Sequence, residues 1–166
     1  MKRAFHLWIC VMLMLGASMV QASQLPASVQ AALIIKLIGF EKKISAAGEV
    51  TIFVMGSPEV AAELEKKIGR KIGKSKLANV VAASGAPPDG AHAIYIAGQA
   101  QLQEGIGFAR SKKILSITGD SSLIDQGVTL GLGVEGGKPK FILNLSASKD
   151  EGLEWRPAIL KIASTI

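Results

Sequence analysis

The order of elements is clearest in ILSITGDSSLIDQGVTLGLGVEGGKPKFILNLSASKDEGLEWRPAILKI, residues 114–162. Its first five residues are mostly apolar or β-branched and predict a strand over 114–118. Gly119-Asp120 comes next, and a glycine–aspartate step after such a run is typical of a tight turn. This segment therefore begins with a strand that ends in a turn.

Two more apolar runs follow, at 128–134 and 140–145, and a Gly136-Gly137 step lies between them. A glycine pair between two runs of strand length favours an antiparallel hairpin. After the hairpin we expect a short helical piece and then a final amphipathic helix over 156–164. The end of the chain is therefore predicted to be an antiparallel pair followed by helix.

Before residue 114, apolar runs of strand length alternate with helical segments. The strands are expected at 50–55, 77–82 and 93–97, and the helices at 28–44, 58–68 and 99–110. Alternation of strands and helices predicts a mostly parallel sheet. Together with the hairpin, it predicts a single α/β domain with a mixed, mostly parallel sheet, a C-terminal antiparallel hairpin and flanking helices.

The first 22 residues have the pattern of a secretory signal. Lys2 and Arg3 form a basic start, residues 7–15 are apolar throughout, and residues 20–22 (VQA) place small side chains at a cleavage site. We expect cleavage after this site, which leaves residues 23–166 as an exported, periplasmic domain. An uncleaved anchor is the alternative, although the apolar run is shorter than the ~20 residues of a membrane span.

Charge and cysteine content exclude several function classes. The chain has 19 basic and 13 acidic residues, so removal of Lys2 and Arg3 leaves a net charge of +4. That charge is low for a dedicated nucleic-acid binder. Cys10 is the only cysteine and lies in the expected leader, so the exported domain has no thiol for a disulfide or a metal. We expect neither a nucleic-acid partner nor a metal.

Residues that could carry catalysis are few. His92 is the only histidine of the exported domain, and no local pattern supplies the nucleophile and orienting acid that a triad needs. Residues 131–136 (GLGVEG) match the letters of the dinucleotide fingerprint, which requires a helix N-terminus after it, whereas here another strand follows. Glycines inside a strand indicate a bulge or close packing. We expect a non-enzymatic protein without a cofactor, in which His92→Ala preserves function.

Two strand ends carry candidate residues for a small ligand. These are Gly56, Ser57, Gly119, Asp120 and Ser121. Sheets of this class often bind ligands beyond the carboxyl ends of their strands, and glycine turns with hydroxyl groups could hold a small anion. The alternative is that Asp120 or Ser121 only caps one short helix.

A second set of residues could bind a protein partner. It consists of Lys67, Arg70, Lys71, Lys74, Phe40 and Trp155. The four cations belong to a basic stretch, 66–76, that contains no acid, and they could face an acidic protein surface or anionic lipid. The alternative is a solvated edge. The two aromatic residues are either anchors of the hydrophobic core or binding hot spots.

The chain resembles the YfiR-like family of small periplasmic bacterial proteins. The resemblance is carried by Ile117-Thr118-Gly119-Asp120, the hairpin, residues 140–145 (KFILNL), Gly152 and residues 160–163 (LKIA), and by the N-terminal helix followed by 50–55 and Gly56. The chain departs from the family at 41–44 (EKKI), where an aromatic–proline step is common. It also lacks the cysteines of some relatives, so redox control through disulfides is not implied.

The resemblance implies a non-enzymatic periplasmic regulator. Such a protein is expected to bind and repress the periplasmic domain of an inner-membrane diguanylate cyclase, or of a related signalling protein, in cyclic-di-GMP signalling and biofilm control. Repression is allosteric, because the regulator prefers the inactive conformer of its partner. A periplasmic small-molecule-binding module is the alternative, and a homodimer is a further assembly to consider.

Overall fold

The computed structural model describes residues 24–166, so the expected leader at residues 1–22 lies outside the described residues. The helices are α1 (Ala27–Ile38), α2 (Lys42–Ala46), α3 (Pro58–Glu65), α4 (Gln99–Lys112) and α5 (Leu145–Asp150), with 3₁₀ segments η1 (Ser121–Leu123) and η2 (Pro157–Lys161). The strands are β1 (Glu49–Met55), β2 (Lys71–Ile72), β3 (Ser75–Ala82), β4 (Ala93–Ile96), β5 (Leu115–Thr118), β6 (Leu130–Glu135), β7 (Lys138–Leu143) and β8 (Ser164–Thr165). Within residues 24–166, no helix combines the length and the apolar character that a bilayer crossing requires.

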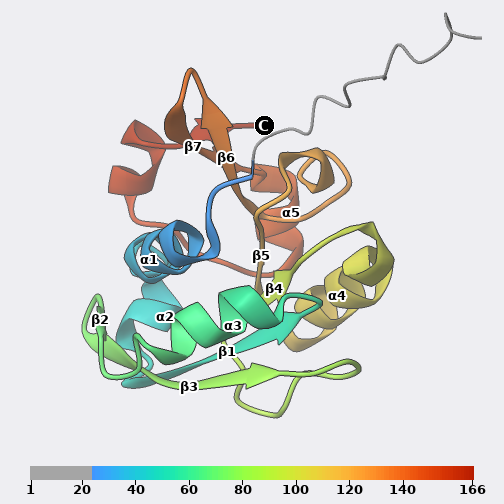
Figure 1. The fold of residues 1–166 in the computed structure, drawn as a ribbon. Coiled ribbons are helices and arrows are strands. Elements are labelled where there is room, and N and C mark those ends of the chain that lie inside the picture. Colours follow the sequence, from blue (N-terminus) through green and yellow to red (C-terminus); the bar gives the residue numbers. More distant parts are fainter. Residues whose placement is uncertain (1–23) are drawn as a thin grey trace, which may run out of the picture.

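The strands of the described residues form one sheet in the order β2-β3-β1-β4-β5-β6-β7-β8. From β3 to β6 all neighbours are parallel, and β7 is parallel to β8. The antiparallel pairs are β6–β7, which is the hairpin expected from the sequence, and β2–β3 at the other end. The predicted fold class, a single mixed α/β domain with a mostly parallel sheet, is therefore confirmed (Figure 1).

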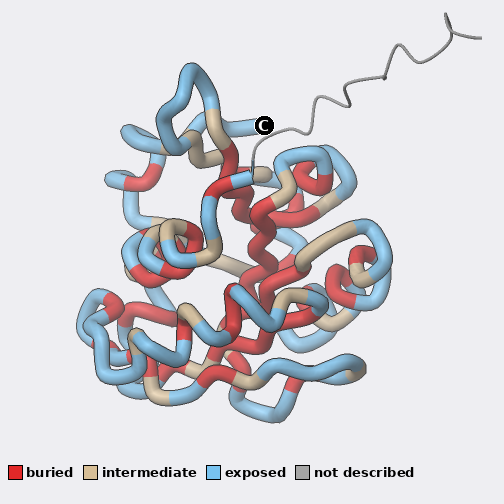
Figure 2. The backbone as a smooth tube through the Cα atoms, in the orientation of Figure 1, coloured by how far each residue is buried: buried red, intermediate tan, exposed pale blue. Residues whose placement is uncertain are grey.

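Helices cover both faces of the central sheet. On one face, α1 and α3 pack against Val50, Ile52 and Val54 of β1. On the other face, α4 packs with Phe53 and Met55 of the same strand. Alternate side chains of one strand thus enter two cores, and a strand covered on both faces needs the continuous apolar run that the sequence shows. Figure 2 shows the buried backbone concentrated in the central strands.

The continuous helix expected over 28–44 is instead two helices, so that expectation is wrong. Between α1 and α2, Glu41 has an extended backbone, with φ −77° and ψ 129°. Its Oε2 accepts a hydrogen bond of 2.7 Å from Ile44 N, and its Oε1 accepts one of 3.0 Å from Glu154 N. The buried carboxylate of Glu41 therefore begins a new helix and ties it to the C-terminal segment.

The helix expected over 156–164 is also wrong. The chain there forms η2 and then β8, which pairs in parallel with the end of β7. The backbone groups along that side of β7 need partners, and an extended segment supplies them where a helix could not. Asn144, expected inside a strand, is the N-cap of α5, and its Oδ1 accepts a 2.9 Å hydrogen bond from Ala147 N.

Candidate functional site

Four cations gather at the β2 end of the sheet, and we call them the cationic edge. Lys67 follows α3, Arg70 precedes β2, Lys71 belongs to β2, and Lys74 lies in the turn between β2 and β3. Arg70, Lys71 and Lys74 are exposed and Lys67 is half-buried. None of the four forms an ion pair with another residue of 24–166. The cationic edge therefore keeps its full positive charge toward solvent.

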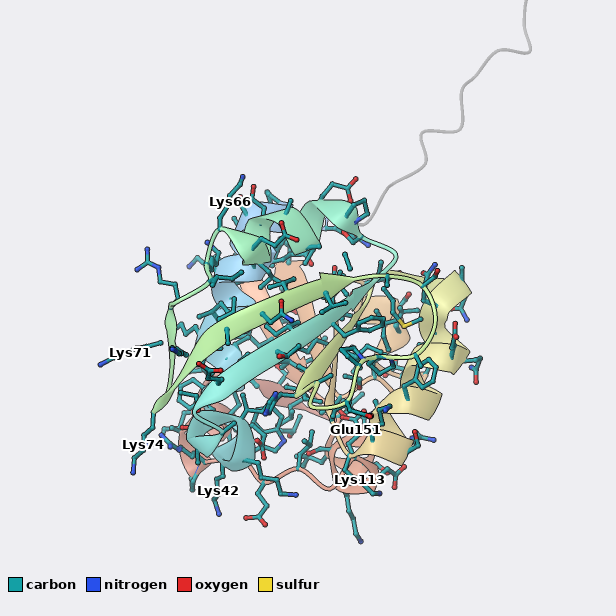
Figure 3. All side chains as sticks on the ribbon, turned by 90° about the horizontal axis from the view of Figure 1, so that it is seen from below. Lys42, Lys66, Lys71, Lys74, Lys113 and Glu151 are labelled. Atoms are coloured by element: carbon teal, nitrogen blue, oxygen red, sulfur yellow. The ribbon has the colours of Figure 1, made fainter. Side chains whose placement is uncertain are left out.

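Lys66 and Lys76, the lysines on either side of the cationic edge, form ion pairs. Lys66 Nζ lies 2.6 Å from Glu63 Oε1, and Lys76 Nζ lies 3.1 Å from Glu49 Oε1. Figure 3 shows Lys71 and Lys74 projecting away from the body of the protein at this end of the sheet. Glu63 and Glu49 are thus paired with Lys66 and Lys76, and neither pairs with the cationic edge.

The hairpin that carries the cations is anchored to α2. Lys74 N donates a 2.9 Å hydrogen bond to Ser45 O. Ser75 Oγ donates to Ile44 O at 2.8 Å and accepts from Gly48 N at 3.0 Å. A helix end followed by a loop was expected over residues 66–76, so β2 was not predicted. In the structure the backbone is held in place while the lysine side chains extend into solvent.

Phe40 and Trp155, the aromatic candidates, lie close together. Arg156 N donates a 2.9 Å hydrogen bond to Phe40 O, and an isolated bridge joins Glu41 to Trp155. Both rings are half-buried and pack against the larger core, and Trp155 Nε1 donates to Ser148 Oγ at 2.7 Å. Both rings therefore serve as anchors of the hydrophobic core, and their partial exposure is not by itself evidence of a binding hot spot.

The turn before Phe40 adjoins the β2–β3 hairpin, which carries Lys71 and Lys74. A Cβ placed on Gly39 would lie 3.1 Å from Gly73 N, which shows how closely the two turns approach. Arg156 Nη2 also donates to Ser45 Oγ at 2.7 Å, next to the same hairpin. The turn that precedes Phe40 and the β2–β3 turn that carries Lys74, distant in the sequence, therefore lie side by side.

The candidate ligand residues lie at the carboxyl ends of β1 and β5, on either side of β4. Gly56 and Ser57 line two neighbouring cavities of about 410 and 310 Å³. Gly119, Asp120 and Ser121 line neither of these two cavities. The structure thus brings the two strand ends to the same edge of the sheet, but only the Gly56-Ser57 turn faces these hollows.

The polar groups of these turns bind their own helices. Ser57 Oγ accepts a 3.3 Å hydrogen bond from Val60 N and caps α3. Asp120 Oδ1 accepts from Ser122 N at 3.0 Å and from Ser122 Oγ at 2.7 Å, at the start of η1. Both turns therefore act as helix caps, which is the alternative that the sequence left open for Asp120.

A buried polar chain, which was not predicted from the sequence, joins β4 to α1 and to the segment before α1. Tyr95 Oη donates to Gln30 Oε1 at 2.7 Å, and Gln30 Nε2 donates to Leu25 O at 2.7 Å. Burial raises the pKa of Tyr95 to about 12. Tyr95 and Gln30 line the smaller cavity, and a Cβ on Gly119 would lie 2.7 Å from Tyr95 Oη. A lone tyrosine within an apolar strand was the available signal, because a buried hydroxyl needs a partner.

His92 has a structural contact in place of a catalytic one. Its Nδ1 accepts a 3.2 Å hydrogen bond from Thr51 N, and its own N donates to Thr51 O at 2.9 Å. Burial lowers the pKa of His92 from its ordinary value. The neutral ring thereby joins β1 to the start of β4. Across residues 24–166, no group of three His, Cys, Asp or Glu side chains is placed to hold a metal ion.

Glu151 is a buried acid that the sequence analysis did not single out. It accepts hydrogen bonds from Ser116 N at 3.1 Å, from Ser116 Oγ, and from Thr129 Oγ1 at 2.8 Å. Its side chain is fully buried, and burial raises the pKa of Glu151 to about 7, although the three hydrogen bonds act to lower it. Glu151 therefore joins the end of α5 to β5 and to the start of β6.

The glycine-rich strand β6 packs closely against η1 at one position. A Cβ on Gly131 would overlap the side chain of Ile124, so the glycine permits close packing of η1 against β6. The chain continues from these glycines into the β6–β7 hairpin, and no helix N-terminus follows them. Gly131 thus serves close packing, as expected for a glycine inside a strand, whereas Gly136 has φ +57° and lies in the hairpin turn.

Comparisons with known proteins point to one family. The family model described as YfiR/HmsC-like matches residues 27–164. A solved structure, a conserved domain protein from Vibrio cholerae O1 biovar El Tor strain N16961, is 16% identical with a TM-score of 0.55. The match covers 84% of this chain and 60% of that one, so this chain spans less than two thirds of its length. A search of the curated proteins found no match.

Proposed function

The chain belongs to the YfiR/HmsC-like family, and we propose that it is a periplasmic, non-enzymatic regulator in cyclic-di-GMP signalling. The partner proposed is the periplasmic domain of an inner-membrane diguanylate cyclase, which the regulator binds and represses. The observation that carries this proposal is the family match, which runs from the start of α1 through β7 to the first residue of β8.

The chemistry of the described side chains supports a binding role. His92 is occupied by the Thr51 backbone, and Glu151 is enclosed by Ser116 and Thr129. Neither can reach a substrate without breaking these contacts. The cationic edge presents four charges of one sign, unpaired within residues 24–166, at one end of the sheet, and such charges favour association with an oppositely charged partner.

Repression then follows from preferential binding. A regulator that binds the inactive conformer of the cyclase more tightly than the active one shifts the population toward the inactive state. A preference of about 1.4 kcal/mol gives a tenfold bias, and a nearly complete switch needs about 5.5 kcal/mol. No chemical step by the regulator is required.

Deletion of the gene tests this proposal. Cellular cyclic-di-GMP and biofilm should rise, and re-expression of the full chain should restore both. A chain that begins after residue 22 should fail to restore them, because it is expected to stay in the cytoplasm. Cross-linking in intact cells should join the regulator to a membrane protein with a cyclase domain. Unchanged cyclic-di-GMP together with no membrane cross-link would overturn the proposal.

A ligand-binding module is the second candidate function, favoured by the two cavities that meet at Gly56-Ser57. Such a module would hold a small molecule beside Tyr95 and Gln30, at the carboxyl edge of the sheet. Native mass spectrometry of protein purified from the periplasm should then show an added mass that Tyr95→Phe reduces. A bare mass in every preparation would count against this candidate.

A further inference from the structure

The outer side of β3 is only partly paired. β2 pairs with its first two residues, and Leu77 then exchanges hydrogen bonds with Arg70 O at 2.9 Å and Gly69 N at 2.7 Å. Beyond Leu77, the backbone pairing of residues 78–82 is with β1 alone. A stretch of β3 is therefore an open sheet edge in the described chain.

The direction of the free amide groups follows from one contact. Ala83 N donates to Val54 O of β1 at 3.3 Å. Successive residues of a strand point their backbone groups to opposite sides, so the N–H and C=O groups of Ala82 and Val80 point away from β1. These groups are placed to receive another strand.

The side chains of this edge do not block an incoming strand. Exposed edges are usually protected by lysine, proline or a covering element. Residues 78–82 read ANVVA and contain no charge and no proline. Asn79 and Ala82 are exposed, whereas Val80 is buried on the face that α3 covers. The open part of β3 is therefore uncharged and accessible.

Charge limits what can pair there. The cationic edge lies at the start of the open segment, with Arg70 bonded directly to Leu77. A second copy of β3 that pairs in parallel would bring its own Lys67, Lys71 and Lys74 against the same cations, and like charges across a strand pair are destabilising. A strand that carries Asp or Glu would instead be attracted to these cations.

We propose that the open edge of β3 receives an extended acidic segment of the partner protein, which adds to the sheet as a strand beside the cationic edge. The proposal rests on the proposed function for the existence of a partner, and it names the surface and the chemistry of the contact. Main-chain hydrogen bonds to Val80 and Ala82 provide the docking, and Lys67, Arg70, Lys71 and Lys74 select an acidic sequence.

A peptide probe tests the surface directly. The probe is a short peptide of alternating glutamate and valine with blocked ends, and its control replaces each glutamate by lysine. Amide hydrogen exchange, followed by NMR on the protein purified from the periplasm, should show slower exchange at Val80 and Ala82 with the glutamate peptide only. Unprotected amides at millimolar peptide, or equal protection by the lysine peptide, would overturn the proposal.

Two variants separate the backbone contact from the charge. Ala82→Pro removes one outward N–H and should abolish binding of the glutamate peptide. The variant is expected to fold, because edge strands tolerate proline on their free side. Lys71→Glu/Lys74→Glu should weaken binding about tenfold or more at low salt. The matched control, Lys138→Glu/Lys149→Glu, makes the same charge change at exposed lysines on β7 and α5 and should leave affinity within about twofold. An equal loss in both double variants would overturn the proposal.

The charge variant keeps the experiment decisive if Ala82→Pro fails to fold. The cell assay separates this proposal from the proposed function. If Lys71→Glu/Lys74→Glu still lowers cyclic-di-GMP as fully as the unmodified chain and cross-links equally to the cyclase, repression stands and the β3 edge is not the docking surface. If the glutamate peptide protects Val80 and Ala82 while deletion leaves cyclic-di-GMP unchanged, the β3 edge stands and the proposed function fails.

Discussion

The two ends of the sheet differ in how the open backbone of their outer strands is protected. At one end, the two-residue β2 covers only the start of β3, cations unpaired within the described residues lie at the start of the open part, and residues 78–82 (ANVVA) carry no charge and no proline. At the other end, the two-residue β8 covers only the last two residues of β7, but residues 138–141 (KPKF) carry lysine and proline, which protect an exposed edge. The β2 end therefore leaves unprotected backbone beside these cations, whereas the side chains of β7 protect the β8 end.

Buried carboxylates secure the C-terminal segment. Glu151 joins α5 to β5 and the start of β6, and Glu41 receives Glu154 N next to α2. Both side chains are fully buried and accept hydrogen bonds from more than one donor. Removal of a buried acceptor leaves its donors unsatisfied, which costs far more than the net gain from forming one hydrogen bond. The C-terminal segment should therefore be sensitive to single substitutions.

The largest expected effect is the loss of the Glu151 carboxyl. Glu151→Ala leaves Ser116 N, Ser116 Oγ and Thr129 Oγ1 without their acceptor and opens a cavity, so the free energy of unfolding should fall by about 3–5 kcal/mol. Glu151→Gln is the control at pH 4.5, where the Glu151 carboxyl is protonated: the amide oxygen still accepts and the amide nitrogen can donate to Ser116 Oγ, at a cost of about 1 kcal/mol. Urea titrations give both values, and equal losses would contradict this role for the carboxylate.

The next effect is a pH dependence that arises from the same group. The pKa of Glu151 is raised from 4.5 to about 7 in the folded chain, so the folded state binds this proton more tightly than the unfolded state. Its contribution to stability is complete below pH 4.5 and is lost as pH rises through about 7. Relative to Glu151→Gln, the unmodified chain should lose up to about 3 kcal/mol between pH 4.5 and pH 8.

Urea titrations of the two proteins across that pH range measure the difference. The Gln variant cannot titrate at this position, so subtraction removes the contributions of all other groups. A difference that stays flat with pH would show that the three donors keep the carboxyl ionised throughout.

The parallel half of the sheet could be predicted because its evidence is local. Strands such as β1 are buried on both faces and appear in the sequence as unbroken apolar runs, and Ser57-Pro58 marks the start of α3 by its own capping contacts. The C-terminal segment could not be predicted in the same way. Whether residues 164–165 form helix or strand depends on the free side of β7, which no local pattern reveals.

The candidate sites show the same division. The basic stretch 66–76 was visible as composition, but its hairpin depends on contacts with α2, which is distant in sequence. Glu151 is an ordinary acid near a helix end in the sequence, and only the approach of Ser116 and Thr129 makes it a buried one. The Tyr95–Gln30 contact joins residues 65 positions apart. Contacts between polar groups that lie far apart in the sequence could therefore not be predicted from local patterns.

A third prediction compares the hairpin turns at the two ends. Gly73 in the β2–β3 turn has φ +63°, and an added Cβ would lie 2.8 Å from Ser45 Cβ. Gly137 in the β6–β7 turn has φ +75°, but an added Cβ would meet nothing within 4 Å. Gly73→Ala should cost about 2–3 kcal/mol through backbone strain and overpacking, whereas Gly137→Ala should cost about 1 kcal/mol through strain alone.

Thermal and urea unfolding of the two glycine variants give the comparison. The β2–β3 turn is therefore expected to be the more rigidly specified of the two, even though its side chains are exposed. Equal losses would mean that the α2 contacts do not hold this hairpin, and the cationic edge would then lack a fixed backbone.

The smallest expected effect on stability is that of reversing the cationic edge. Lys71→Glu/Lys74→Glu removes two exposed charges that have no ion-pair partner in residues 24–166, so the free energy of unfolding should change by no more than about 0.5 kcal/mol. The sign should be slightly stabilising at low salt, because repulsion with Lys67 and Arg70 is relieved, and the gain should vanish as salt screens exposed charges. Urea titrations at two salt concentrations, with Lys138→Glu/Lys149→Glu as the control, provide the measurement. A loss above about 1 kcal/mol would mean that these lysines support the fold itself, and the contrast between a protected β8 end and an open, cationic β2 end would no longer hold.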